Sequence, residues 1–180
     1  MEQERLKKIF KIFRIIATAS AAVSALFFLL SLAVFVPMIF IRENLTVEAG
    51  GILGFFLDVV KEGENPITSA DLVLSVMPRF VQLFLFLLLS LCFASALKKG
   101  EKEATLAFCG AKKAFARLSL LSFLSALLPS VLTKVARATV SRDFFNITET
   151  SYTGWLVLAL VLLLGSLLLD AKGSSREKEG

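Results

Sequence analysis

Four long stretches of apolar residues alternate with polar and charged segments along the chain. None of the four contains Asp, Glu, Lys or Arg, which is typical of segments surrounded by lipid rather than water. A helix rises by about 1.5 Å per residue, so roughly 20 residues cross a hydrocarbon core of about 30 Å. The pattern predicts an all-α fold, a four-helix transmembrane bundle in one domain over residues 1–170, with spans at about residues 15–41, 80–97, 118–133 and 150–169.

The segment before the first stretch has an amphipathic pattern. Within residues 1–14, Leu6, Ile9, Phe10 and Phe13 recur at helical spacing among five cations, which predicts a lead-in helix on the membrane surface. A signal peptide is the rival interpretation, but its apolar region is roughly 7–15 residues long. Here the uncharged run that follows has 27 residues, so we expect it to be retained as the first span.

The third stretch follows a basic segment with its own apolar stripe at steps of three and four residues. This predicts a helix from about Glu103, with a cytoplasmic extension that enters the bilayer near Leu118. The uncharged core has only 16 residues, so Arg117 and Lys134 at its ends must snorkel. The last segment, residues 171–180, is polar and is predicted to be a disordered tail.

The longest polar connection covers residues 42–70. Its apolar part, residues 50–57, is too short to span and is expected to rest in the interface or to dip against the bundle. Thr68 or Ser69 is predicted to cap the second helix, with Asp71 in its first turn.

Prolines and charges give further boundaries. Pro78 and Arg79 are expected to interrupt the second helix, with Arg79 snorkelling at the outer boundary of the span. The sequence 98–100, Lys-Lys-Gly, is expected to end that helix. Pro37 is expected to kink or end the first helix, and Pro129 to kink the third.

The distribution of Lys and Arg predicts the orientation in the membrane. The N-terminal segment, the 98–117 loop and the tail hold fourteen cations, whereas the connections on the other side hold six. Cytoplasmic loops carry the excess of Lys and Arg. We therefore expect a multi-pass protein of the plasma membrane, which in a bacterium is the inner membrane, with both termini in the cytoplasm.

Composition argues against several classes of function. Histidine, the commonest general base and metal ligand, is absent, and Cys92 and Cys109 show no metal or redox spacing. The carboxylates of residues 42–70 are scattered, and no GK[ST] follows the glycines near residue 50. We expect no enzymatic activity, no catalytic residue, no metal and no cofactor. The net charge of +5 indicates membrane topology rather than nucleic-acid binding, because no reader motif is present.

Candidate packing residues are small side chains at four-residue steps, which let helix backbones approach closely in lipid. They predict packing within the bundle or between two copies of the chain. The set consists of Ala17, Ser20, Ala21, Ser24 and Ala25 in the first span and Gly165 in the last.

Two further sets concern the membrane surface. Tyr152 and Trp155 begin the fourth span, where interfacial aromatic anchors belong. The triplets that begin at Asn44 and Asn146 are N-x-T sequons in connections expected outside, and the sequence leaves their glycosylation open. A basic set, predicted to contact anionic lipid headgroups or a cytoplasmic partner, consists of Lys98, Lys99, Lys102, Lys112, Lys113 and Arg117.

The layout resembles a bacterial family of small four-helix integral membrane proteins of unknown function. The likeness covers most of the chain and includes a basic start, an extended first outer loop and the Lys-Lys-Gly turn at residues 98–100. It also includes a basic helix over residues 104–117 and a last span that closes at residues 167–170 before a charged tail. The family has no settled activity, so the resemblance implies a fold and no catalytic residue.

Together these patterns favour a non-enzymatic multi-pass membrane protein. We expect an accessory, regulatory or scaffold subunit that acts through helix packing and its basic cytoplasmic loop. Its expected partners are the lipid bilayer, anionic headgroups, and a second copy or another membrane protein. The alternative is a small transporter or channel component that forms its path as an oligomer. No ionisable residue lies within the four predicted cores, which counts against a path inside one chain.

Overall fold

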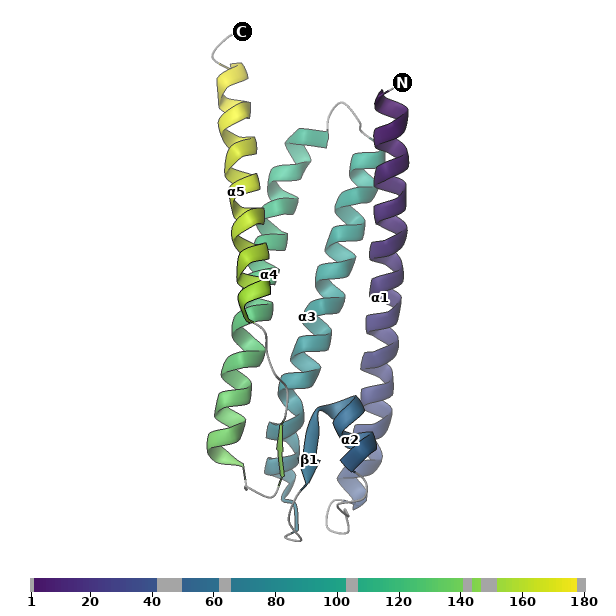
Figure 1. The fold of residues 1–180 in the computed structure, drawn as a ribbon, viewed down its shortest axis with the longest axis vertical. Helices are drawn as coiled ribbons and strands as arrows, with labels where there is room; N and C mark the ends of the chain where they lie inside the picture. The colour runs from purple at the N-terminus through teal and green to yellow at the C-terminus, as the bar shows by residue number, and fades with distance from the viewer. Residues whose placement is uncertain are drawn as a thin grey trace. The chain divides into compact units, whose positions relative to one another are not determined.

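The computed structural model describes residues 2–41, 50–61, 66–102, 107–140, 144–146 and 152–177 (Figure 1). The elements are α1 (Glu2–Ile41), α2 (Gly50–Leu57), β1 (Val59–Lys61), α3 (Ser69–Lys102), α4 (Ala107–Thr139), β2 (Phe144–Asn146) and α5 (Tyr152–Glu177). The predicted helical architecture is therefore confirmed, with the addition of one small sheet.

Three helices are long and apolar enough to cross a membrane, over Lys8–Phe40, Ser69–Lys98 and Lys113–Thr139. In α5 the apolar helix found among the described residues is Gly154–Gly165, which is shorter than a span. The fourth span and the bundle arrangement stay predictions.

The chain forms two compact units. Unit 1 consists of residues 1–23, 86–124 and 153–180, and unit 2 of residues 24–85 and 125–152. The helices α1, α3 and α4 each contribute to both units. The two predicted ends of the bundle therefore fall in different units.

Many small side chains are buried, and many large apolar side chains are exposed. Among the described residues, Ala21 and Ser31 have at most 4% of their surface exposed, whereas Leu29, Leu120 and Val161 are about 60% exposed. In lipid, the acyl chains solvate large aliphatic side chains, and close helix approach favours small residues between helices. This distribution is the one expected for helices whose solvent is a bilayer.

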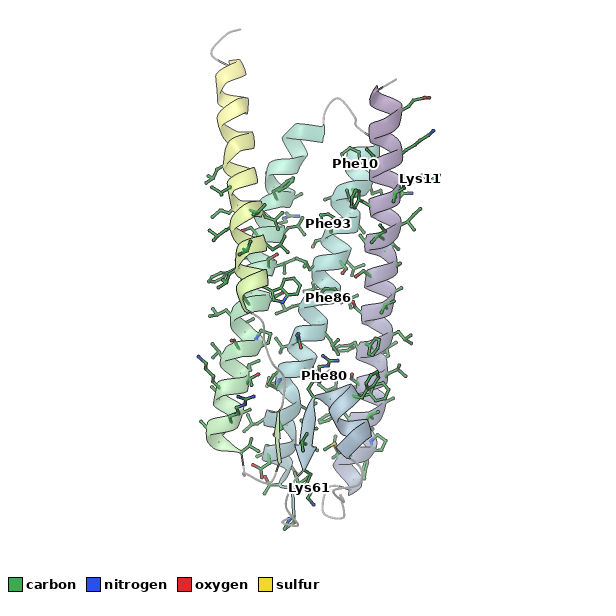
Figure 2. All side chains as sticks on the ribbon, in the orientation of Figure 1. Phe10, Lys11, Lys61, Phe80, Phe86 and Phe93 are labelled. Carbon is green, nitrogen blue, oxygen red and sulfur yellow. The ribbon has the colours of Figure 1, made fainter. Side chains whose placement is uncertain are left out.

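The first helix is continuous from Glu2 to Ile41, so the lead-in segment is not separated from the span. Pro37 lies inside the helix without ending it. Proline removes one N–H donor, and a helix that is already about ten turns long on its N-terminal side tolerates that loss near its end. In unit 2, α1 packs on α3 through edge-to-face ring contacts of Phe28 and Phe35 with Phe80, at centroid distances of 5.4 and 5.6 Å (Figure 2).

The predicted cap of α3 is confirmed. Thr68 Oγ1 accepts a hydrogen bond from the Asp71 backbone N–H at 3.1 Å and donates to the Asp71 carboxylate at 2.7 Å. The expected interruption at Pro78 and Arg79 is wrong, because α3 continues through both to Lys102. The expected end at residues 98–100 is also wrong. One more hydrogen bond per residue offsets the single glycine, and lysines in the last turns are favourable at a helix C-terminus.

Residues 50–57 form α2, which packs against α1 in unit 2. Ser31 Oγ donates to the Phe56 carbonyl at 2.8 Å, and Leu57 is fully buried. Of the two expectations for this segment, contact with a long apolar helix, α1, is the one observed. Directly after α2, Asp58 adopts a left-handed conformation with φ of 53°, which turns the chain into β1.

The strand pair β1–β2 was not predicted. It is antiparallel and pairs Val59 with Asn146, Val60 with Phe145 and Lys61 with Phe144. Strands of three residues carry no readable alternation, so no sequence signal separates them from loop. Of the two sequons, Asn146 ends β2, whereas Asn44 lies outside the described residues.

Two helices extend beyond their predicted ends. The helix α4 continues to Thr139 rather than giving way to a loop at Lys134, and α5 continues to Glu177, through part of the segment predicted to be a disordered tail. Elongation of an existing helix needs no new nucleus, so polar residues add to the end of an apolar helix at little cost. The expected start of the third helix, Glu103, lies outside the described residues.

Candidate functional site

The small residues of α1 are turned inward. Ala17, Ala21 and Ser24 are 4–6% exposed, and Ala25 is half-buried. In unit 1, the hydroxyl oxygen of Ser20 lies 3.4 Å from that of Ser90 in α3. The small residues of unit 1 thus face a neighbouring helix of the same chain.

The buried polar side chains are mainly hydroxyls. Of the ten buried polar or charged side chains in the described part of the chain, eight are Ser, one is Thr and one is Lys. Several donate to helix carbonyls: Ser119 to Ala159 at 2.8 Å, Ser122 to Leu118 at 2.8 Å and Thr133 to Pro129 at 2.7 Å. The Ser119 hydroxyl connects α4 with α5, whereas the hydroxyls of Ser122 and Thr133 bond to carbonyls of their own helix. In both cases the hydroxyl is not left unpaired in an apolar environment.

In unit 1, α5 contacts α4 and α3. A methyl group built on Gly165 would lie 3.3 Å from Phe115 Cδ1, so glycine at this position allows close approach of a ring. Trp155 meets Phe86 edge-to-face, with ring centroids 6.0 Å apart (Figure 2). This contact gives Trp155 a packing role in unit 1 besides its predicted role as an anchor. The side chain of Tyr152 lies outside the described set.

The basic candidates belong to unit 1. Lys98, Lys113 and Arg117 are exposed, and Lys11 in α1 projects outward in Figure 2. Unit 1 holds fourteen Lys and Arg against seven Asp and Glu, whereas unit 2 holds six against eight. The positive charge is thus concentrated in one compact unit. The side chains of Lys99, Lys102 and Lys112 lie outside the described set.

Unit 2 contains an ion pair that the sequence analysis missed. Arg79 Nη1 of α3 lies 3.1 Å from Asp58 Oδ2, and both side chains are about 20% exposed. The sequence analysis expected Arg79 to snorkel and did not identify this partner. Arg79 is the only charged residue of the sequence between Leu72 and Leu97, and this was the available signal, since a charge in such a segment requires a partner.

Further polar groups lie in the same unit. Within the described residues, Arg79 Nε and Gln82 Oε1 are buried without a hydrogen-bond partner, and Lys61 of β1 is 4% exposed. Arg79 and Gln82 are three residues apart and share one face of α3.

No group of three His, Cys, Asp or Glu side chains in the described ranges is arranged to hold a metal ion. Comparisons with protein-family models, with curated proteins and with solved structures found no match. The resemblance to small four-helix bacterial membrane proteins accordingly stays a prediction.

Proposed function

We propose that this chain is a non-enzymatic, multi-pass protein of the plasma membrane that serves as an accessory, regulatory or scaffold subunit. It crosses the bilayer four times with both termini in the cytoplasm, and α5 supplies the fourth span. It acts through packed helices and through the basic surface of unit 1.

The observation that carries this proposal is that side chains of the chain itself pack and hydrogen-bond in its interior. Many of the buried side chains are small, and buried hydroxyls donate to carbonyls of the chain itself, such as Ser31 to Phe56 and Ser119 to Ala159. An interior occupied by its own packing supports a structural role. The exposed apolar faces, for example Val161 of α5 at 60%, then remain for lipid or a second membrane protein.

The concentration of cations in unit 1 supports the proposed orientation. A thiol-mapping experiment tests it. In a background without Cys92 and Cys109, a membrane-impermeant maleimide added to intact cells is expected to label K134C of unit 2 and to spare K113C of unit 1. Labelling of K113C alone would overturn the orientation.

Photo-crosslinking in native membranes tests the subunit role. A photoreactive residue at exposed Val161 is expected to give one adduct of discrete mass. The matched control is the neighbouring Leu162, which is 8% exposed and is expected to give none. If Val161 and a second exposed position, Leu29 of α1, yield only lipid adducts, the subunit role is wrong.

A small transporter or channel component is the second candidate function. It is favoured by the Asp58–Arg79 pair and by the buried, unbonded Arg79 Nε and Gln82 Oε1 atoms in the described part of unit 2. Purified protein in vesicles would show flux that depends on Gln82 if this were the function. Absence of flux for common inorganic ions would favour the first proposal.

A further inference from the structure

The outward face of α4 in unit 1 combines two cations with apolar side chains. Lys113, Arg117 and Leu120 are separated by steps of four and three residues, which aligns them on one face of the helix. All three are exposed, Leu120 by 59%, and Phe123 beside them is 44% exposed. Ser122, on the opposite face, is fully buried. The exposed stripe therefore has a cationic end and an apolar end.

The two cations have no counter-charge on their own helix. The sequence of α4 contains no Asp or Glu, and neither Lys113 nor Arg117 pairs with an acidic group in the described ranges. They lie one turn apart, about 6 Å along the axis, and like charges at this spacing repel. A phosphate oxygen between them would accept hydrogen bonds from both and remove the repulsion.

Two contacts fix how α5 lies beside α4 in unit 1. Ser119 Oγ donates to the Ala159 carbonyl at 2.8 Å. Four residues earlier in α4, Phe115 contacts Gly165, which is six residues later in α5. The two helices are therefore antiparallel, and the start of α4 lies beside the end of α5.

This register gives the depth of the cations. Arg117 lies at the level between the two contacts, where α5 exposes Leu163 and Leu164 by 45% and 56%. The first acidic residue of α5, Asp170, lies roughly 10 Å further along the helix axis. Arg117 thus starts inside the apolar band, and its side chain reaches the headgroup level by snorkelling.

We propose that this face binds one anionic phospholipid, with its phosphate between Lys113 and Arg117 and an acyl chain along Leu120 and Phe123. The excess of cations in unit 1 favours an anionic over a zwitterionic headgroup. The site rests on the proposed function in one respect, that these helices span a membrane with unit 1 on the cytoplasmic side.

Purified full-length protein in neutral detergent tests the site. The unfolding temperature is measured while phosphatidylglycerol is added, and separately while phosphatidylcholine of the same acyl chains or inorganic phosphate is added. Of these three additions, only phosphatidylglycerol is expected to raise the unfolding temperature in a saturable way. Each basic residue near an anionic surface contributes roughly a factor of five, so K113Q/R117Q should weaken the apparent affinity about 25-fold.

The matched control removes two exposed cations of the same helix in unit 2, Lys134 and Arg137. K134Q/R137Q is expected to keep the response to phosphatidylglycerol. Native mass spectrometry counts the bound lipid independently of stability. Equal responses to both lipids, a response to phosphate alone, or an unchanged response of K113Q/R117Q would overturn the site.

The thiol-mapping result separates the two proposals. If K113C is protected in cells and phosphatidylglycerol has no effect, only the lipid site is wrong. If K113C is labelled from outside the cell, the proposed orientation is wrong, and the lipid site that depends on it is wrong too.

Discussion

The ion pair between Asp58 and Arg79 in unit 2 is expected to contribute to the free energy of unfolding. The two charged groups are 3.1 Å apart, and each side chain retains about 20% of its exposure. Loss of one partner costs about 3–5 kcal/mol for a fully buried pair and about 0.2–1 kcal/mol for an exposed one. With residual exposure discounted, we expect about 2 kcal/mol.

The substitution must avoid a second effect at Asp58. Its φ of 53° is left-handed, a region in which Asn and Asp are far better tolerated than Ala. D58N therefore removes the charge and keeps the backbone preference, whereas D58A would add strain. The expected loss of about 2 kcal/mol is then attributable to an uncompensated Arg79 guanidinium.

A double-mutant cycle with R79M separates the pair from its surroundings. Equilibrium unfolding in mixed micelles with SDS, followed by circular dichroism, gives the free energy of unfolding of each variant. The double variant D58N/R79M holds no unpaired charge at this position and is expected to recover at least about 1 kcal/mol of the summed losses. An interaction free energy below about 0.3 kcal/mol would refute the reasoning. Arg137, exposed on α4, provides the control, since R137M is expected to stay within about 0.5 kcal/mol of the parent.

Three further changes test the packing contacts. T68A removes the cap of α3 and is expected to lower the free energy of unfolding by about 1 kcal/mol, with faster amide exchange in the first turn as the measurement. G165L is expected to cost about 1–3 kcal/mol and to lower the unfolding temperature, because its side chain meets the Phe115 ring, whereas G165A should be milder since that ring can shift. S31A is expected to cost about 1–2 kcal/mol by leaving the Phe56 carbonyl without its donor, and an unchanged stability would exclude that hydrogen bond.

The existence of the helices could be predicted from the sequence, and their ends could not. Long charge-free stretches indicate segments that are surrounded by lipid rather than water, and they identified the three helices that are long enough to span. The same signal does not report where helical backbone stops. Residues 98–102 are polar and residues 134–139 contain Lys134 and Arg137, yet both stretches are helical, because an existing helix extends through polar residues at little cost.

The candidate site was predictable only where one helix determined it. Spacing alone aligned Lys113 with Arg117, since both lie on α4. The contact of Gly165 with Phe115 needs the register between two helices, and the Asp58–Arg79 pair needs a turn that brings a connection back to α3. Neither register nor turn is encoded by local periodicity.

The pairing of β1 with β2 has a consequence for how the protein is made. Val59 and its partner Asn146 are separated by 87 positions, so the second strand leaves the ribosome well after the first. At a synthesis rate of about 5–20 residues per second, β1 exists for on the order of 4–17 s before its partner strand β2 has been made. In the proposed topology, the sheet forms only after α3 and α4 have both been inserted, with the connections before α3 and after α4 on the same face of the membrane. A chain that stops after Thr139 lacks β2 and so presents an open strand edge to proteases and chaperones.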